Sequence, residues 1–246
     1  MVDILKFNNK FASIIRVTGI LDLLFPSACI NCKKPVKFEE NSVCNECLSS
    51  VKLIEEKCER CSGIIEKGKC TICSDREFYI KKNIAVAEYS GLIKELLHVL
   101  KFNKRRRLYR HLSKIAYPEL LKSKIDCDML SSVPMSSTNR WERGFNQSEL
   151  ISKDLSSMLG LPYHELLREN RNTISQKGLG YRDRFINVLN KYCVNDPSFI
   201  IGKKILLVDD VFTTGATMNE CARILLESGA LEICSLTIAR AKVDSL

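Results

Sequence analysis

The 246-residue sequence predicts an α/β domain with a mostly parallel sheet, preceded by a small cysteine-rich domain. Short apolar runs alternate with amphipathic stretches from residue 84 onward, the pattern of domains in which strands and helices alternate. Ahead of that segment, eight cysteines form four C-x-x-C pairs. With 45% hydrophobic and 27% charged residues, the chain has the composition of folded domains, which excludes the collagen-like and disordered classes.

The first 26 residues predict an amphipathic helix that ends at Pro26. Its apolar stripe would pack on the rest of the protein, on a second subunit or on a membrane surface. Charged residues interrupt it, and no apolar run approaches the roughly 20 residues that span a bilayer. We therefore expect a cytoplasmic protein without a transmembrane segment or secretion signal, with association at the inner face of the membrane as a further option. The stripe consists of Ile4, Phe7, Phe11, Ile14, Ile15, Leu21 and Phe25.

The cysteine pairs predict two structural zinc sites. Two C-x-x-C pairs complete a tetrahedral shell of four thiolates, so eight cysteines make two closed sites. Because no ligand position is left for water, we expect both Zn²⁺ ions to supply folding free energy rather than catalysis. The alternative, a redox motif, has one pair beside a βαβ pattern rather than four in series. The expected ligands are Cys29, Cys32, Cys44, Cys47, Cys58, Cys61, Cys70 and Cys73.

The spacing allows two ways of grouping the pairs. Sequential grouping gives two zinc ribbons in tandem, whereas interleaved grouping joins the first pair to the third. We prefer sequential grouping because Gly63 and Gly68 lie between the last two pairs, where a short hairpin needs a turn. Interleaved grouping stays open at this point.

The α/β segment predicts its elements from apolar periodicity. Strands are expected at 84–89, 128–133, near 163–167, 192–194, 204–209 and 233–239, and helices at 91–101, 106–122, 147–159 and 216–228. Residues 77–83 would join the two parts. The expected organisation is therefore an N-terminal helix at 1–26, a double zinc-ribbon domain at 27–76 and the α/β domain at 84–246.

The net charge of +9 is concentrated in one segment. Residues 84–125 carry 10 basic and 3 acidic side chains, a net charge of +7, and such a local excess is typical of surfaces that bind polyanions. Phe102 and Tyr109 are interleaved with these charges, as in proteins that combine phosphate contacts with base stacking on single strands. A solvated helix face is the alternative. The candidate nucleic-acid residues are Lys101, Lys104, Arg105, Arg106, Arg107 and Arg110.

Residues 204–217 combine the groups that bind a sugar phosphate. An apolar run ends in Asp209 and Asp210, as in a buried parallel strand whose carboxyl end reaches the ligand-binding edge of an open sheet. The run Thr213–Thr217 then opens a helix, where backbone N–H groups and hydroxyls can hold a phosphate. The two carboxylates can accept hydrogen bonds from vicinal hydroxyls. A capped helix beside two solvated acids is the alternative.

This stretch resembles the 13-residue signature with which type I phosphoribosyltransferases bind 5-phosphoribosyl 1-pyrophosphate (PRPP). The resemblance implies that Asp209 and Asp210 bind the ribose hydroxyls and act in catalysis. It also implies that pyrophosphate is displaced from PRPP by a nitrogen nucleophile, with Mg²⁺ bound to the substrate rather than caged by protein. The implied phosphate-binding residues are Val211, Thr213, Thr214, Gly215, Ala216 and Thr217.

Two further segments resemble parts of these enzymes by position. Pro134, Met135 and Ser136 correspond to a loop that binds pyrophosphate, with Arg140 and Arg143 as bidentate charge partners. The basic segment 168–187 would form a lid that excludes water. Trp141 would either stack on a base or anchor its loop.

Four C-x-x-C pairs ahead of an α/β segment with Val133-Pro134 and Arg143-Gly144-Phe145-Asn146-Gln147 make the chain similar, over essentially its whole length, to the ComF (ComFC-type) competence family. The resemblance implies that the protein handles incoming single-stranded DNA during natural transformation, with a DNA-uptake helicase as a partner. The chain departs from the family at 188–192, where relatives have a Gly-Ala-Phe-like stretch. The similarity rests on the cysteine pairs and on Tyr89, Leu96, Lys101-Phe102, Val133-Pro134, Arg143-Gly144-Phe145-Asn146-Gln147, Thr173, Gln176, Leu179, Arg184 and Asn187.

The sequence thus leads us to expect a PRPP-binding, phosphoribosyltransferase-like protein of the DNA-uptake machinery. One alternative is an active phosphoribosyltransferase that modifies a nucleobase or another small nitrogen nucleophile and has no DNA role. The other is a PRPP-sensing regulator without catalysis. No residue identifies the acceptor.

Overall fold

The computed structural model describes residues 27–36, 42–54, 58–63, 65–66, 68–70, 73–74, 77–103, 105–170 and 189–241. The chain forms two compact units, residues 1–51 and 52–246, and each contains one group of four cysteines. The N-terminal helix expected at 1–26 lies outside the described residues. The three domain boundaries expected from the sequence stay a prediction.

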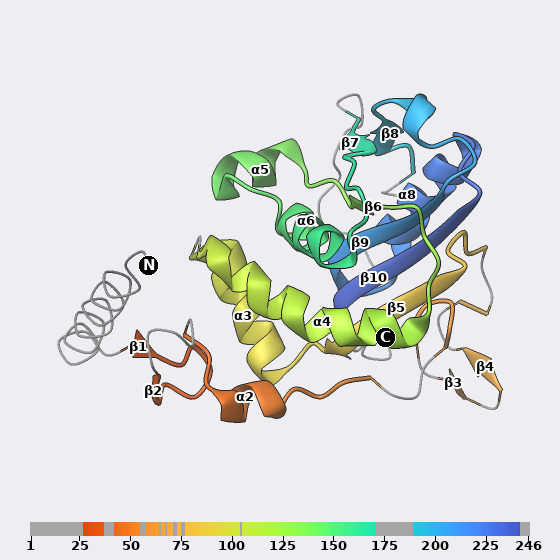
Figure 1. The fold of residues 1–246 in the computed structure, drawn as a ribbon. Coiled ribbons are helices and arrows are strands. Elements are labelled where there is room, and N and C mark those ends of the chain that lie inside the picture. The colour runs from red at the N-terminus through yellow and green to blue at the C-terminus, as the bar shows by residue number, and fades with distance from the viewer. Residues whose placement is uncertain are drawn as a thin grey trace, which may run out of the picture. The chain divides into compact units, whose positions relative to one another are not determined.

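The described part of the smaller unit is a short hairpin followed by a helix (Figure 1). β1 (Ser27–Ala28) pairs antiparallel with β2 (Pro35–Val36), and the first cysteine pair lies between these strands. α2 (Asn45–Ser49) begins at the second pair, where Cys44 is the N-cap and its Sγ accepts the N–H of Cys47. Each pair therefore occupies a tight turn, as a four-thiolate metal site requires.

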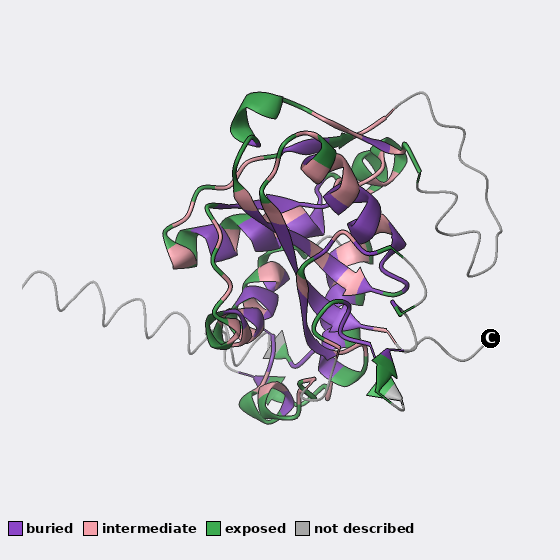
Figure 2. Ribbon diagram, turned by 90° about the vertical axis from the view of Figure 1, so that its right-hand side faces the viewer, coloured by how far each residue is buried: buried purple, intermediate pink, exposed green. Residues whose placement is uncertain are grey.

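The larger unit is built on a four-stranded parallel sheet in the order β5-β10-β9-β6. The central strands are buried on both faces, as expected when helices cover each side of a parallel sheet. Figure 2 shows these strands as the buried interior of the unit. The strands are β5 (Lys82–Glu88), β6 (Met129–Ser132), β9 (Lys204–Phe212) and β10 (Glu232–Arg240).

Helices cover the two faces of this sheet (Figure 1). α4 and α6 pack on one face, and α8 packs on the other against β9 and β10. No helix of the described residues is long and apolar enough to cross a membrane. The elements are α3 (Gly91–Phe102), the 3-10 helix η2 (Arg106–Leu108), α4 (Tyr109–Ser123), α6 (Gln147–Leu159) and α8 (Ala216–Glu227), in agreement with the expected helices.

The strand expected near 163–167 is displaced along the chain. β7 (Leu167–Glu169) pairs antiparallel with β8 (Tyr192–Val194), whereas Tyr163 forms only an isolated bridge with Leu130 of β6. The prediction was wrong here because the partner of β7 lies more than 20 residues away in sequence, so local pattern does not set its register. Residues 171–188, which contain most of the expected lid, lie outside the described residues.

In the described part of the larger unit, two short helices were not predicted from the sequence. α5 (Ser137–Arg143) and the 3-10 helix η3 (Pro197–Phe199) contain no buried residue, so no apolar periodicity marks them. α5 begins at Ser136, whose hydroxyl accepts the N–H of Asn139, and ends at Gly144 with a φ of +76°. Its start and end are therefore set by capping residues rather than by packing.

The second cysteine group belongs to the core of the larger unit. β3 (Ile65–Glu66) and β4 (Lys69–Cys70) form a hairpin, and the turn contains Gly68 with a φ of +78°. This confirms the turn expected at the glycines between the last two pairs. The buried side chains of Cys61, Cys70 and Cys73 pack in one apolar cluster with residues of the sheet and α8.

Candidate functional site

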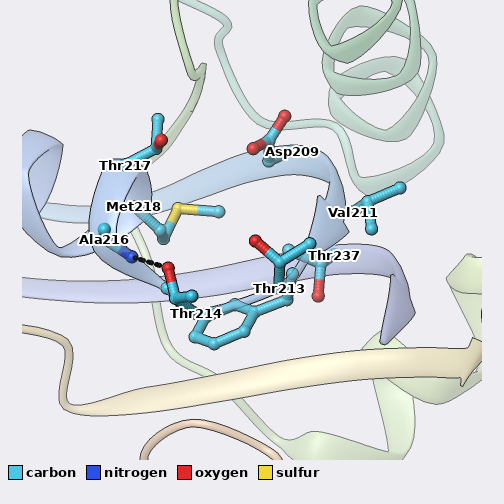
Figure 3. A pocket seen from close by; sticks show the side chains of 10 residues that line it. Asp209, Val211, Thr213, Thr214, Ala216, Thr217, Met218 and Thr237 are labelled. Atoms are coloured by element: carbon cyan, nitrogen blue, oxygen red, sulfur yellow. Dashed lines mark hydrogen bonds between the residues drawn. The ribbon is translucent and has the colours of Figure 1, made fainter. Parts of the chain in front are cut away.

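The carboxyl end of β9 and the amino end of α8 enclose a small hollow of about 50 Å³ (Figure 3). Successive residues of a strand point to opposite faces, and Asp209 points to the hollow. The structure thereby brings the whole predicted phosphate loop together with one of the two predicted acids. The hollow is lined by Asp209, Val211, Phe212, Thr213, Thr214, Gly215, Ala216, Thr217, Met218 and Thr237.

Gly215 lets the loop turn tightly into α8. Its φ of +80° favours glycine, and a Cβ at this position would lie 2.4 Å from Cζ of Phe212. Thr214 Oγ1 accepts the N–H of Ala216 at 3.2 Å (Figure 3). The positive end of a twelve-residue helix therefore lies at the wall of the hollow, which is the arrangement that binds phosphate groups.

Asp209 is held by two donors. Its Oδ1 accepts hydrogen bonds from Ser148 Oγ and from the backbone N–H of Asp210, each at 2.8 Å. Burial and the negative charge of Asp210 raise the pKa of Asp209 to about 7, although these donors and the Lys101 ammonium act in the opposite direction. A ligand that donates hydrogen bonds to this carboxylate would favour its ionised form.

Asp210 is held by a lysine from α3. Lys101 Nζ lies 2.6 Å from Asp210 Oδ2, and Gln147 Nε2 donates to the same oxygen at 2.7 Å. The Lys101 side chain is 19% exposed and the Asp210 side chain 9% exposed. The sequence predicts Lys101 as part of the basic stretch, but the structure places its ammonium on the second predicted acid.

We expect Lys101→Met to lower the free energy of unfolding by about 2–4 kcal/mol, because Asp210 would stay buried without its counter-ion. Lys101→Arg keeps the positive charge and should cost less. Urea unfolding of both variants and the wild type measures the difference. Equal stability of Lys101→Met and the wild type would mean that the ammonium does not stabilise Asp210.

The loop after β6 forms one wall of a second, larger cavity of about 390 Å³. Arg140 reaches this cavity but is paired with Glu149 at 3.1 Å and with Glu165 at 3.2 Å. Of the predicted pyrophosphate loop, Pro134 and Met135 line the cavity, whereas Ser136 caps α5. The cavity is lined by Pro134, Met135, Ser137, Arg140, Glu165, Arg168 and Glu169.

Arg143 does not line either cavity. Its guanidinium lies 5.6 Å from the centroid of the Phe102 ring, and Nη1 donates to Gln147 Oε1 at 3.5 Å. Because Gln147 binds Asp210, Arg143 reaches the predicted ribose-binding acids only through this amide. Trp141 is 87% exposed, so it does not anchor its loop by burial.

Arginines and aromatic rings lie close together on the surface formed by the end of α3, η2, the start of α4, the end of α5 and the turn after it. Arg106 donates to the carbonyl O of Gly144 at 3.1 Å and lies 4.9 Å from the centroid of the Phe145 ring. The Phe102 ring is 62% exposed. We call this the arginine–aromatic surface; it comprises Phe102, Arg105, Arg106, Arg107, Tyr109, Arg110 and Arg143, while Lys104 lies outside the described residues.

The cysteines form two groups of four, and in each group all Sγ atoms lie within 4.8 Å of one another. Zinc–sulfur bonds of about 2.3 Å require sulfur–sulfur separations of about 3.8 Å in a tetrahedron. The Sγ atoms of Cys32 and Cys44, and those of Cys58 and Cys73, are 3.6 Å apart, which fits. The grouping is sequential: the first cluster is Cys29, Cys32, Cys44 and Cys47, and the second cluster is Cys58, Cys61, Cys70 and Cys73.

Burial and local hydrogen bonds shift the pKa of cysteine thiols in both clusters. Burial opposes ionisation of Cys29, but the backbone N–H groups of Cys44, Cys32 and Asn31 outweigh it and lower its pKa to about 6. In the second cluster, burial and the Cys58 thiol raise the pKa of Cys73 to about 12. In the first cluster, the Cys47 N–H lowers the pKa of Cys44, but burial and hydrogen bonds with the thiols of Cys47, Cys32 and Cys29 outweigh it and raise that pKa to about 12. A metal at either cluster therefore has to displace firmly held protons.

Sequence reasoning missed three polar side chains of the site. Gln147 is the last residue of the Arg143-Gly144-Phe145-Asn146-Gln147 motif, and Ser148 follows it. The structure shows that Gln147 donates to Asp210 and that Ser148 donates to Asp209. Thr237 of β10 lies opposite Asp209 in the strand register. Among the described residues, its Oγ1 is the buried side-chain oxygen without a hydrogen-bond partner, so a donor stands free at the wall of the hollow.

Comparisons with known proteins match both parts of the chain. Residues 147–245 match the phosphoribosyl transferase domain, and residues 20–77 match the double zinc ribbon domain. DNA utilization protein YhgH of Escherichia coli is 29% identical over 219 residues, covering 86% of this chain and 96% of that protein. Competence protein F of Haemophilus influenzae is 28% identical, with 88% and 98% covered. Competence protein ComFC of Streptococcus pneumoniae is 28% identical, with 82% and 89% covered.

Proposed function

The chain belongs to the ComF/YhgH family, with a phosphoribosyltransferase domain and an N-terminal double zinc ribbon, and on that basis we propose that it binds PRPP. The observation that carries this proposal is the hollow where Asp209 and the loop 213–217 meet the amino end of α8. The buried Thr237 hydroxyl, without a partner among the described residues, supports a polar ligand at the same wall.

In this proposal the 5′-phosphate lies in the loop 213–217, where backbone N–H groups and threonine hydroxyls donate to it. Asp209 accepts hydrogen bonds from the ribose hydroxyls. Asp210 also accepts one, although its Oδ2 is already bound by Lys101 and Gln147. Mg²⁺ bound with the ligand would offset the charge of the pyrophosphate. Asp209 offers it one carboxylate, which suits a cation that keeps most of its waters.

The pyrophosphate would extend toward the larger cavity, along Pro134, Met135 and Ser136. Arg140 and Arg168 supply guanidinium donors there, and Arg140 would exchange Glu149 or Glu165 for the ligand. Arg143 would act on the ligand only through Gln147.

Phosphoribosyl transfer would break the bond between ribose C1 and pyrophosphate and form a bond from C1 to a nitrogen nucleophile that gives up a proton. Calorimetry with PRPP and Mg²⁺ tests the binding step. A pyrophosphate-release screen over nucleobases and single-stranded DNA then separates an enzyme from a PRPP sensor. A folded protein that takes up no PRPP would overturn the proposal.

A second function, binding of single-stranded nucleic acid, is favoured by the arginine–aromatic surface. Guanidinium groups bind phosphates, and an exposed ring such as Phe102 can stack on a base. The names of the relatives, a DNA utilization protein and competence proteins, agree with this proposal. We also propose that the protein is cytoplasmic and that Zn²⁺ occupies both clusters. Its proposed partner is a DNA-uptake helicase.

Replacing Arg105, Arg107 and Arg110 by Ala should flatten the salt dependence of binding to single-stranded DNA. Each phosphate neutralised contributes about −0.7 to the log–log slope, so three lost contacts make the slope less negative by up to about 2. Fluorescence titrations over a series of salt concentrations measure it. Phe102→Ala should instead weaken binding without changing the slope.

Lys114→Ala, on the exposed part of α4, serves as the control for a single charge outside the surface. A triple variant with the wild-type slope would mean that these arginines are a solvated helix face and that DNA, if bound, lies elsewhere.

A further inference from the structure

We propose that the second cluster holds the phosphate loop in position through Phe78 and Asn219, so that metal binding at the cluster and PRPP binding at the loop strengthen each other. The inference rests on the proposed PRPP site. Neither residue is among those that line the hollow, so both are positioning residues. Three sets of contacts within the larger unit connect the two sites.

The first connection runs through the ring of Phe78. Arg60, between Cys58 and Cys61, donates from Nη2 to the carbonyl O of Phe78 at 3.0 Å. The Phe78 ring packs against Phe212, and a Cβ on Gly215 would lie 3.0 Å from its Cζ. The phosphate loop therefore packs against the Phe78 ring, and the backbone of Phe78 is hydrogen-bonded to the turn that contains Cys58 and Cys61.

The second connection is the side-chain amide of Asn219, in the first turn of α8. Its Oδ1 accepts the N–H of Tyr79 at 2.7 Å, and its Nδ2 donates to the carbonyl O of Glu77 at 3.1 Å. Asn219 is 7% exposed, so water does not readily replace these bonds. Its own N–H donates to the carbonyl O of Gly215 at 2.8 Å. One residue thus links the segment after the second cluster to the loop.

The third connection is a shared core. The apolar cluster that contains three of the four cysteines also contains Phe212, Ala216 and Met218 of the loop and helix. Since packed cores have few voids, loss of order at the cysteines is transmitted to the side chains they touch. The first cluster belongs to the other unit of the chain and provides an internal control.

If the loop takes its binding geometry only while the second cluster is intact, the two binding events are thermodynamically linked. Linkage is reciprocal, so PRPP must raise the metal affinity of the second cluster by the factor by which the metal raises PRPP affinity. A coupling of about tenfold lies within the usual range. A cluster that loses its metal by local opening, without movement of the loop, would show no such PRPP dependence.

The test follows zinc loss from the full chain, with and without PRPP in excess Mg²⁺. A zinc-selective chelator removes the metal, an alkylating reagent marks each exposed thiol, and peptide mass spectrometry assigns the rates to individual cysteines. We expect PRPP to slow alkylation of Cys58, Cys61, Cys70 and Cys73 by about tenfold and to leave the first cluster unchanged. The double variant Asp209→Asn, Asp210→Asn should lose this protection.

Asn219→Ala tests the route. It should keep two zinc ions, bind PRPP more weakly and reduce the protection ratio toward one, whereas Ser228→Ala, at the other end of α8, should retain the wild-type ratio. Equal alkylation rates with and without PRPP, while calorimetry shows PRPP bound, would overturn the coupling and leave the proposed function intact. A wild-type ratio in Asn219→Ala would overturn the assigned route. Absence of PRPP binding would overturn the proposed function and the coupling with it.

Discussion

Replacing Asp209 and Asp210 together by Asn should abolish PRPP binding in calorimetry while the far-ultraviolet circular dichroism stays unchanged. Each carboxylate lost removes a charge-assisted hydrogen bond of roughly 1.5–3 kcal/mol. The pair therefore accounts for about 3–6 kcal/mol, or roughly 10²- to 10⁴-fold in affinity.

The two single variants should differ. Asp209 lines the hollow, so Asp209→Asn should account for most of the loss of affinity. Asp210 is bound by Lys101 and Gln147, so Asp210→Asn should lower stability as well as affinity. Asp126→Asn, whose carboxylate is 80% exposed beside Lys204, is the control for removal of an acid remote from the loop. Unchanged PRPP affinity in the double variant would end the assignment of these acids to the ribose.

The sequence predicted the regular part of the larger unit well. β9 begins as an apolar run of buried residues that leads into Asp209 and Asp210, and α8 begins at the loop that follows, so local pattern defines both elements. α5 could not be found in this way because it buries none of its residues. β7 could not be placed because its register depends on β8, which follows a long intervening segment.

The candidate site was predicted in part for the same reason. The loop 213–217 and Asp209 are neighbours in sequence, so a motif can identify them together. Lys101 is one of ten basic residues in its segment, and nothing local distinguishes it from the others. Only the packing of α3 near the carboxyl end of β9 brings its ammonium to Asp210. The hydroxyl of Thr237 is likewise a feature of strand register rather than of pattern.

The cysteine clusters show what the spacing could and could not decide. The eight C-x-x-C cysteines gather in the sequential groups that we preferred. Their division between two compact units was not predicted, because the spacing is similar in both. The difference lies in the surroundings: Cys61 and Cys73 are packed in the core cluster beside α8, whereas Cys29 and Cys47 are buried in the other unit.

This division predicts unequal effects of losing one ligand from each cluster. Cys73→Ser should lower the zinc content by one ion and abolish the cooperative melting transition of the unit 52–246, because the four thiolates are part of its core. Structural zinc contributes on the order of 10–16 kcal/mol to zinc-finger sites, which is comparable to the roughly 5–15 kcal/mol stability of a whole domain. Elemental analysis and thermal melts followed by circular dichroism measure both losses.

Cys32→Ser is the matched control. It should also lower the zinc content from two to one, but the unit 52–246 should keep its melting transition and its affinity for PRPP, since the first cluster belongs to the other unit. The opposite pattern, a wild-type melting transition in Cys73→Ser with one zinc lost, would mean that the core beside α8 closes without the metal. Because serine differs from cysteine by one atom, the contrast between the two variants reports on the surroundings of each cluster rather than on the size of the substitution.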